Sequence, residues 1–332
     1  MKAAVLNQYG TAAPVSVQEV AVPELADTEV LVKVKAAGVN PVDNLIKNGN
    51  IWPVAPYSLP LIMGNELAGE VEAVGSSVTD YLPGDRVMTR LPLEKIGAFA
   101  QYVAVDARWL CKTPNYLSDV EAAAVPLTAL TAMEAFTLLE LKQGQSLFIS
   151  GGSGGFGAMA IPLAKAFGYP VYTSGSAENR DRVMALGADL YFDYKTEDYS
   201  EFLHDVDGVI SSVGVKELPK EFSILKPGGH LVALQGMPNR RFAKRNQLTA
   251  VQTALFSMTG LKYDRMAAKH GVTYDFMFCG AADKDLKLAV QILEEKGIKP
   301  NIAEVLPLDE VNEALEMEAG HGKKGRIVLT MD

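Results

Sequence analysis

The feature that most constrains this chain is a glycine-rich loop between an apolar strand and a helix. The apolar segment Ser146–Ser150 leads through Gly152-x-Gly154-x-x-Gly157 into the helical stretch Ala158–Phe167. Glycines allow a tight turn and a close approach of the backbone to a pyrophosphate, and the helix N-terminus supplies N–H donors and the positive end of a dipole. In this context the spacing is typical of a dinucleotide-binding fold.

Two other kinds of site use similar loops. A Walker loop needs Lys followed by Ser or Thr directly after its last glycine, and the next lysine here is Lys165, so that reading fails. Gly151-x-Ser153-x-Gly155 also matches the nucleophile elbow of an α/β-hydrolase, which requires an acid and then a histidine downstream. Only His321 lies suitably late. A serine hydrolase built on Ser153 therefore stays open, as does a module that binds a cofactor without catalysis.

The secondary-structure pattern of the sequence changes at Ser118. Ser118-Asp-Val-Glu121 is a capping-box pattern before an apolar helical stretch that runs to about Leu141. Beyond it, strands are expected at 146–150, 171–174, 207–213, 231–234 and 272–278, with helices at 158–167, up to 187 and at 218–225. This alternation predicts an α/β fold with a doubly wound parallel sheet.

Residues 1–110 are rich in strand patterns instead. The segments 29–35 and 67–75 alternate apolar and polar residues, and Pro83-Gly84-Asp85 supplies turn chemistry, so we expect a β-barrel. After Gly280 we expect a helix at 284–296, a strand near 302–305, a helix that begins at Asp309 and a last strand at 326–330. This tail is expected to return to the first domain, which gives domains 1–122 with 281–332, and 123–280.

Composition limits the function classes. The 332 residues suit about two domains of ~150 residues. The net charge of −9 repels phosphate backbones and anionic lipid heads unless a basic patch overrides it, so neither nucleic acid nor membrane is an expected partner. The basic run Asn239–Arg245 is interpreted as a solvated surface loop. The chain starts without a signal-peptide pattern and has two separate cysteines, Cys111 and Cys279, which favours the cytoplasm.

The second strand of the parallel sheet carries the signal for cofactor choice. A NAD-specific site places Asp or Glu at its end to hold the ribose hydroxyls, but Val171–Ala177 has no carboxylate there. Ser174, Ser176, Arg180 and Arg182 could instead bind and neutralise a 2′-phosphate. The sequence therefore favours NADP(H) over NAD(H).

Several further motifs, spread over the whole length, accompany the glycine loop: Ala37-Gly-Val-Asn-Pro-Val-Asp43, Met63-Gly-Asn-Glu-Leu-Ala-Gly69, Pro83-Gly-Asp-Arg-Val87, Ala122-Ala-Ala-Val-Pro-Leu-Thr-Ala-Leu-Thr-Ala132, Leu186-Gly-Ala-Asp189, Leu225-Lys-Pro-Gly-Gly229 and Gly325-Arg-Ile-Val-Leu329. With them the chain resembles the medium-chain dehydrogenase/reductase superfamily, and within it the zinc-free quinone oxidoreductase and enone reductase branch. The resemblance implies a GroES-like barrel joined to a Rossmann domain, with the cofactor in the cleft between them. It also implies a homodimer formed through the last Rossmann strand.

The resemblance further implies site residues. Zinc-bearing alcohol dehydrogenases hold their metal with Cys, His and Cys, and the matching positions here are Asn40, Asn65 and Leu127, so no metal is expected. Asn40 would lie by the nicotinamide and the substrate carbonyl, and Asp43 would brace its loop. Trp52 and Tyr57 could line the same pocket, whereas Ile51 stands where quinone reductases often carry a tyrosine.

The cofactor-binding positions implied by the resemblance are Asn40, Thr131, Gly151, Gly154, Gly155, Phe156, Gly157, Ser174, Ser176, Arg180, Tyr194, Val213, Gly214, Gly236, Phe276, Met277 and Phe278. The expected activity is an NADPH-dependent, zinc-independent reduction of quinones or of the C=C bond of α,β-unsaturated carbonyls. In it, hydride passes from the nicotinamide to an electrophilic carbon, and the protein contributes positioning and electrostatics.

Overall fold

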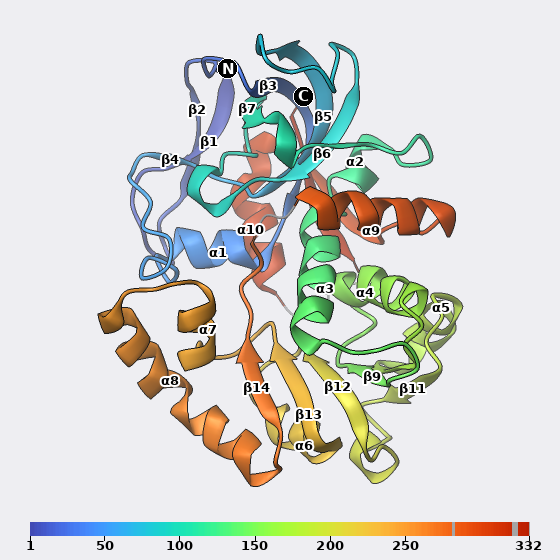
Figure 1. Cartoon of the computed structure of the whole chain (residues 1–332). Helices are drawn as coiled ribbons and strands as arrows, with labels where there is room; N and C mark the ends of the chain where they lie inside the picture. The colour runs from blue at the N-terminus through green and yellow to red at the C-terminus, as the bar shows by residue number, and fades with distance from the viewer. Residues whose placement is uncertain (281–282, 321–324, 332) are drawn as a thin grey trace. The chain divides into compact units, whose positions relative to one another are not determined.

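The computed structural model describes residues 1–280, 283–320 and 325–331, which form two compact units (Figure 1). Unit 1 comprises Met1–Leu130 and Gly280–Asp332, and unit 2 comprises Thr131–Cys279. The boundary falls within helix α3 (Pro126–Leu139).

Unit 1 is built on two sheets. A seven-stranded sheet has the order β15-β16-β3-β5-β6-β8, with β7 also paired to β3, and a three-stranded sheet has the order β2-β1-β4. The strands are β1 (Lys2–Leu6), β2 (Val15–Glu19), β3 (Glu29–Val39), β4 (Leu61–Ile62), β5 (Glu66–Val74), β6 (Arg86–Arg90), β7 (Tyr102–Asp106), β8 (Cys111–Lys112), β15 (Ile302–Pro307) and β16 (Arg326–Thr330). The helices are α1 (Pro41–Lys47), α2 (Asp119–Ala122), α9 (Asp283–Glu295) and α10 (Val311–Ala319).

The alternating pattern of β3 explains its place in the sheet. Val30, Val32 and Val34 are buried, whereas Lys33 between them is exposed, as expected where successive side chains point to opposite faces. Gly84, with φ +92°, makes the turn between β5 and β6, a backbone conformation that glycine adopts without strain. The strands predicted at 29–35 and 67–75 are confirmed.

Unit 2 contains a six-stranded parallel sheet with the order β11-β10-β9-β12-β13-β14. Its strands are β9 (Leu147–Ile149), β10 (Val171–Gly175), β11 (Leu190–Asp193), β12 (Val206–Ser211), β13 (Leu225–Ala233) and β14 (Thr273–Phe276). From β9 the chain adds β10 and β11 on one side, and then crosses to the other side of β9 to add β12, β13 and β14. This is the strand order of a Rossmann fold. The predicted fold class, an antiparallel β unit with a doubly wound parallel-sheet unit, is confirmed.

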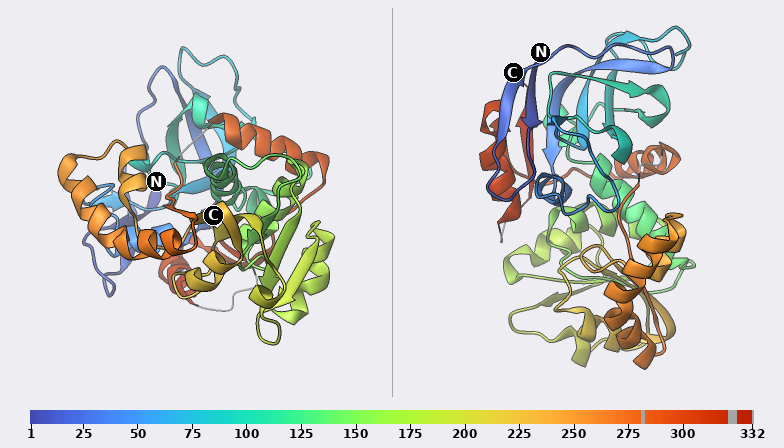
Figure 2. Two further views of the ribbon diagram at one scale, coloured as in Figure 1. Left: turned by 60° about the horizontal axis from the view of Figure 1, so that its bottom comes forward. Right: turned by 90° about the vertical axis from the view of Figure 1, so that its left-hand side faces the viewer.

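The helices of unit 2 are α4 (Gly155–Ala166), α5 (Arg180–Ala185), α6 (Leu218–Ser223), α7 (Arg240–Arg245) and α8 (Ala250–Lys269). Figure 2 shows α7 and α8 from two further directions. The prediction that 239–245 is a surface loop was wrong. The Asn239 side chain caps α7 by accepting the Phe242 N–H at 3.0 Å, and Phe242 and Ala243 are buried.

The predicted helix from Ser118 to Leu141 is divided in two. The capping box of Ser118 and Glu121 starts α2 as expected, but α3 begins anew at Pro126, because proline has no N–H and fits only the first turn of a helix. Within the described residues, the stretch Asp119–Leu139 is long and apolar enough to cross a membrane. Because most of this stretch is buried inside the protein, it has the character of a core helix.

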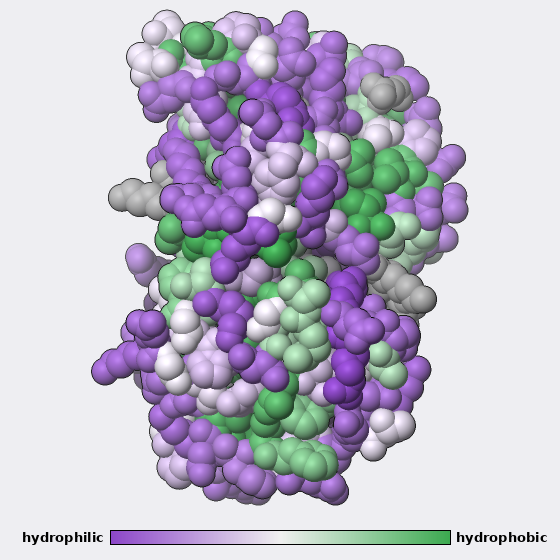
Figure 3. Space-filling model, turned by 90° about the vertical axis from the view of Figure 1, so that its right-hand side faces the viewer, coloured by the Kyte–Doolittle hydropathy of each residue, from purple (hydrophilic) through white to green (hydrophobic). Residues whose placement is uncertain are grey.

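Exposed apolar side chains are spread over the surface of both units. Examples are Leu82 in unit 1 and Phe202 in unit 2, each about two-thirds exposed. On the face drawn in Figure 3, hydrophilic residues lie between smaller apolar areas. Single exposed apolar residues of this kind are normal in folded proteins.

Candidate functional site

Three adjacent strands of unit 1 bring a buried polar cluster together. In the register of the sheet, Ile327 of β16 faces Val39 of β3, which sets Arg326 beside Asn40. On the other side of β3, Gly38 faces Glu66 of β5. Strands that are far apart in the sequence thus supply a cation, an amide and a carboxylate to one place.

Glu66 is the centre of this cluster. Its Oε1 accepts hydrogen bonds from the Asn40 Nδ2 at 2.8 Å and from the Arg326 guanidinium, and its Oε2 accepts the Leu127 N–H at 2.7 Å. A Cβ on Gly38 would lie 2.4 Å from Oε1, so glycine there makes room for the carboxylate. The side chains of Glu66 and Arg326 are 0% and 8% exposed, and the two charges neutralise each other away from water.

The Asn40 side chain makes all its hydrogen bonds within the protein. Its Nδ2 donates to Glu66 and, at 3.1 Å, to the Gly38 carbonyl, while its Oδ1 accepts from Arg326. Asn40 is fully buried. The expectation that this amide donates to a substrate oxygen stays a prediction, and in this arrangement both of its hydrogens are already engaged.

Asp43 and Asn65 extend the cluster. Asp43 lies in the first turn of α1, where its Oδ2 accepts the Asn40 backbone N–H at 2.8 Å and its Oδ1 accepts the Asn65 Nδ2 at 2.7 Å. Burial raises the pKa of Asp43 to about 7, because removal from water disfavours the charged carboxylate. The Asn65 Oδ1 is buried without a hydrogen-bond partner among the described residues. It is an acceptor to which a ligand N–H or O–H could bind.

The aromatic candidates differ in their surroundings. Trp52 is 59% exposed, whereas Ile51 beside it is buried. Tyr57 is half-buried and has its hydroxyl out of contact with water, with no hydrogen-bond partner in the described part of the chain. Burial raises the pKa of Tyr57 well above its ordinary value, so this hydroxyl stays protonated at neutral pH and keeps a proton to donate.

The three positions that the family resemblance assigns to zinc ligands do not have the donor chemistry of a zinc site. Asn40 and Asn65 offer amides that are bonded to carboxylates, and Leu127 offers only an aliphatic side chain. Cys111 lies in β8 of unit 1, and Cys279 follows β14 in unit 2. Over the described ranges, no three His, Cys, Asp or Glu residues are grouped so that they could hold a metal.

In the glycine loop of unit 2, Gly152, Gly154 and Gly157 differ in how much space a side chain would have. A Cβ on Gly152 would lie 2.0 Å from the Thr173 hydroxyl, and one on Gly157 would lie 2.2 Å from the Gly152 carbonyl oxygen. At Gly154 the nearest protein atom would be 3.4 Å away. Gly152 and Gly157 are therefore needed for packing within the protein. The space at Gly154 is open to a ligand. These features fit a bound dinucleotide at the N-terminus of α4.

The parallel sheet brings most of the cofactor candidates to one edge. Ligands of open α/β sheets bind outside the carboxyl ends of the strands, next to the point where the strand order reverses. Residues at or just beyond the carboxyl ends of β9 to β14 are Gly151, Gly154, Gly155, Phe156, Gly157, Ser174, Ser176, Tyr194, Val213, Gly214, Gly236, Phe276, Met277 and Phe278. Thr131 lies in α3 instead, and Asn40 belongs to unit 1.

The end of β10 is polar and contains no acid. Ser174 and Ser176 are buried there, and the Ser174 hydroxyl accepts the Gly151 N–H at 3.4 Å. Arg180 is 43% exposed, and its Nη2 lies 2.8 Å from the Glu197 Oε2. Its guanidinium also lies 5.2 Å from the centre of the Tyr191 ring. The arginine is thus held near the strand end by a partly exposed ion pair that an incoming anion could compete for.

Sequence reasoning assigned no role to Glu66 and Arg326, and it assigned Arg182 to the 2′-phosphate of the cofactor rather than to the glycine loop. Glu66 and Arg326 were part of motifs, yet their pairing links residues 260 positions apart. Arg182 donates from Nη2 to the Ser153 carbonyl at 2.6 Å and so braces the glycine loop. The one sequence signal for the Glu66–Arg326 pair was the charged residue at the start of the apolar strand Arg326–Thr330.

Within the described residues, no histidine is placed to act as the base of a serine hydrolase built on Ser153. His204 and His270 are exposed, and His230 is paired with Asp275 at 2.8 Å. In the sheet register, His230 is level with Leu147, before the carboxyl end where Ser153 lies. His321 falls outside the described residues. Nothing described activates the Ser153 hydroxyl as a nucleophile.

Comparison with known proteins adds family information. Residues 26–115 match the model of the alcohol dehydrogenase GroES-like domain, and residues 186–329 match the model of the zinc-binding dehydrogenase. A quinone oxidoreductase from Coxiella burnetii has a similar structure, with a TM-score of 0.83, 28% identity, and coverage of 100% of this chain and 99% of that one.

Two curated relatives are similar in sequence. The mitochondrial reticulon-4-interacting protein 1 of Caenorhabditis elegans is 30% identical over 352 residues, which cover 96% of this chain and 92% of that protein. The chloroplastic NADPH-dependent alkenal/one oxidoreductase of Arabidopsis thaliana is 34% identical over 245 residues, or 71% of this chain and 63% of that protein. The chain therefore spans less than two thirds of the length of the Arabidopsis relative.

Proposed function

Because the chain belongs to the medium-chain dehydrogenase/reductase superfamily, we propose that it is an NADPH-dependent, zinc-independent reductase of quinones or of the C=C bond of α,β-unsaturated carbonyls. One observation carries this proposal: amides and a leucine stand at the zinc positions Asn40, Asn65 and Leu127. Oxidation of a simple alcohol needs a group that stabilises the alkoxide, which in the metal-bearing relatives is zinc acting as a Lewis acid. Reduction of a conjugated acceptor spreads the new charge onto oxygen, where a neutral donor suffices.

The nicotinamide supplies the hydride when the cofactor is bound. The glycine loop and the carboxyl ends of the parallel strands hold the cofactor, and the Glu66–Arg326 pair keeps Asn40 and α1 in position. The Tyr57 hydroxyl is the neutral donor that we assign to the substrate oxygen, because it is buried and has no described partner. In the cluster of Asn40, Asp43 and Glu66, the Asn65 Oδ1 is an acceptor without a described partner.

The reaction can be tested directly. The purified protein is expected to oxidise NADPH with small enones or quinones as acceptors, and to give negligible NADP reduction with ethanol. Treatment with a chelator is expected to leave this activity intact, because the donor set cannot hold zinc. Brisk alcohol oxidation without reduction of enones or quinones would reverse the assignment, and loss of activity on chelation with rescue by zinc would refute the metal-free mechanism.

The role of Tyr57 is tested within the same assay. Tyr57→Phe removes only the hydroxyl and is expected to lower kcat by about 10- to 100-fold, as the loss of a general-acid or oxyanion donor does in other enzymes. Tyr81→Phe is the control, because the Tyr81 hydroxyl donates to the Leu110 carbonyl at 2.6 Å and has a structural partner. It should lower stability and leave kcat unchanged. Equal kcat in Tyr57→Phe and wild type would remove Tyr57 from the mechanism.

Cofactor preference follows from Arg180 and the acid-free end of β10. Wild type is expected to bind NADPH more tightly than NADH, and Arg180→Ala to weaken NADPH about tenfold, the lower end for a charge-assisted contact because the side chain is partly exposed. Affinity for NADH should change little. Glu197→Gln, which frees the arginine, is expected to strengthen NADPH binding. Equal affinities of wild type for the two cofactors would contradict the preference.

A further inference from the structure

A buried carboxyl that the proposed reaction does not use lies in unit 2. Glu221 belongs to α6, where Leu218 and Phe222 pack in the apolar core. Glu221 is 0% exposed, and neither of its carboxyl oxygens has a hydrogen-bond partner among the described residues. An ionised carboxylate in this place would be a charge without water and without a partner, which is rare in folded proteins.

The polar side chains beside this carboxyl are two serines. Ser150 directly follows β9, and Ser211 is the last residue of β12. The Ser150 Oγ already accepts the Ser212 N–H at 2.9 Å, and the Ser211 Oγ is buried without a described partner. A neutral carboxyl has a proton that it can donate to either hydroxyl, whereas an ionised carboxyl has none.

The surroundings favour the neutral acid. Burial raises the pKa of Glu221 to about 7, because removal from water disfavours the charged form. The Ser211 and Ser150 hydroxyls act in the opposite direction, and the negative charge of Glu217 raises the pKa slightly further. At neutral pH the acid is therefore close to its midpoint, where a new charge nearby changes its protonation.

This carboxyl lies at the point where the order of the parallel strands reverses. β9 and β12 are neighbours in the sheet, but β10 and β11 come between them along the chain. The Ser212 Oγ donates to the Ser150 carbonyl at 2.5 Å, and a Cβ on Gly151 would lie 2.7 Å from the Val213 Cγ1. The segments that follow the two strands thus contact each other, and both contain residues assigned to the cofactor. Through Ser150, Glu221 reaches the start of the glycine loop.

The other ionisable groups around α6 are paired, neutral or exposed. Helix α6 packs against β12, β13, α8 and the turn Tyr199–Glu201. Glu217 accepts the Tyr199 hydroxyl at 2.8 Å, and burial holds the pKa of Tyr199 well above its ordinary value, so this hydroxyl stays neutral. Three ion pairs lie on these elements and their neighbours: Lys220 with Asp198, Lys226 with Asp207, and His230 with Asp275.

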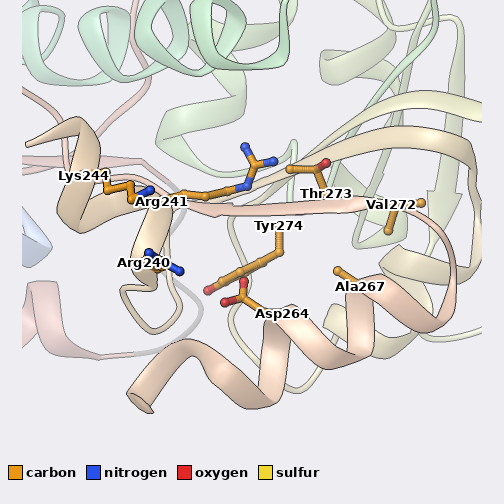
Figure 4. Close-up of a pocket in the computed structure, with 8 residues that line it drawn as sticks. All are labelled: Arg240, Arg241, Lys244, Asp264, Ala267, Val272, Thr273 and Tyr274. Carbon is orange, nitrogen blue, oxygen red and sulfur yellow. The ribbon is translucent and has the colours of Figure 1, made fainter. Parts of the chain in front are cut away.

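The groups of α8 complete this environment. Asp264 lies beside Tyr274 in Figure 4 and accepts the Asn239 Nδ2 at 2.8 Å. His270, at the end of α8, stacks on the Phe222 ring with centroids 6.4 Å apart. The other charged side chains of α8 and of the turn are exposed, namely Lys262, Arg265, Lys269 and Glu201. Glu217 is therefore the neighbour whose charge has to be controlled for in a test of Glu221.

We propose that Glu221 is a positioning residue that couples cofactor binding in unit 2 to the uptake of a proton, an inference that rests on the proposed function. The pyrophosphate brings negative charge to the loop that follows Ser150 and so favours the neutral acid. By linkage, the neutral acid favours the bound cofactor to the same extent. Affinity for the cofactor should then fall as the pH rises and Glu221 ionises in the free protein.

Calorimetric titration with NADPH tests this coupling. For wild type we expect the Kd to rise about tenfold from about pH 6.5 to about pH 8.5. Titrations near the middle of this range, in two buffers that differ in ionisation enthalpy, should show uptake of roughly half a proton or more per cofactor. Glu221→Gln keeps the size and neutral charge of the protonated acid. It should lose most of the pH dependence and bind NADPH more tightly than wild type at the higher pH.

Two comparisons separate Glu221 from other acids. Glu217→Gln removes the neighbouring carboxylate of α6 and should keep the pH dependence, at a slightly lower pH because a like charge is gone. Burial also raises the pKa of Asp43 of unit 1 to about 7. The titration is therefore repeated with 2′-phospho-ADP-ribose, which carries the pyrophosphate but no nicotinamide, and we expect the same response.

The possible outcomes separate this inference from the proposed function. Wild type with equal affinity for NADPH across this range and no proton uptake would overturn the inference, and so would Glu221→Gln with the wild-type response. If Glu221→Gln does not fold, Glu221→Met serves as the second neutral variant, and if neither folds, the response of wild type to 2′-phospho-ADP-ribose decides. Absence of binding of both NADPH and NADH at every pH would refute the proposed function, and the inference with it.

Discussion

Replacement of Gly157 by alanine is expected to reduce cofactor affinity at least about 100-fold, whereas the same replacement at Gly154 is expected to spare the fold and weaken only binding. At Gly157 the added Cβ would lie 2.2 Å from the Gly152 carbonyl oxygen and 2.4 Å from the Gly152 Cα. Both are backbone atoms that cannot swing aside. The loop must therefore shift, and with it the N–H groups at the start of α4.

Gly154→Ala is the matched control for this experiment. Its φ of −81° suits any residue, and the nearest protein atom to the new Cβ would be 3.4 Å away. Alanine is a poorer N-cap than glycine, so the change should cost about 1 kcal/mol or less, and thermal unfolding should be only slightly below that of wild type. Fluorescence titration with NADPH should nevertheless show weaker binding, because the methyl group fills the space left for the pyrophosphate. Unchanged affinity in Gly154→Ala would contradict placement of the cofactor at this loop.

Sequence reasoning located this loop because its information is local. The glycine spacing, the apolar strand before it and the helix after it lie within 146–167, and each fixes a short-range property of the backbone. The same holds for the capping box at Ser118 and for the turn at Gly84. That the sheet of unit 2 is parallel followed from the alternation of strands and helices along the chain.

The partners of buried polar groups could not be predicted in this way. Asn40 was selected as a donor to substrate, but its bonds to Glu66 and Arg326 depend on the register of three strands, one of which lies 286 residues away in sequence. Register is set by packing of whole strands rather than by any single residue. Helix α7 was missed for a related reason. Its basic residues are typical of a solvent-exposed segment. The buried side chains of Asn239, before these residues, and of Phe242, among them, fix the helix in place.

Replacement of Arg326 by methionine is expected to lower the free energy of unfolding by about 3–5 kcal/mol, the usual cost of leaving one partner of a buried ion pair unpaired. Glu66 is fully buried, and without the guanidinium its Oε1 keeps only the hydrogen bond from Asn40. The Asn40 Oδ1 loses its donor as well. The penalty arises where the ends of β16, β3 and β5 meet, because Glu66 is left there as a buried charge without its cation.

Arg86→Met provides the comparison, because Arg86 and Asp119 pair at 2.7 Å with side chains 35% and 37% exposed. A partly exposed pair of this kind contributes about 0–1 kcal/mol. Arg86 also donates to the Leu117 carbonyl at 2.8 Å, so the control should lose some stability in urea but clearly less than Arg326→Met. Combination of Arg326→Met with Glu66→Gln should recover part of the loss, since the neutral amide no longer leaves a buried charge unpaired. If Arg326→Met is no less stable than Arg86→Met, then Glu66 is either solvated or protonated in the folded protein, and the pair does not hold Asn40 in place.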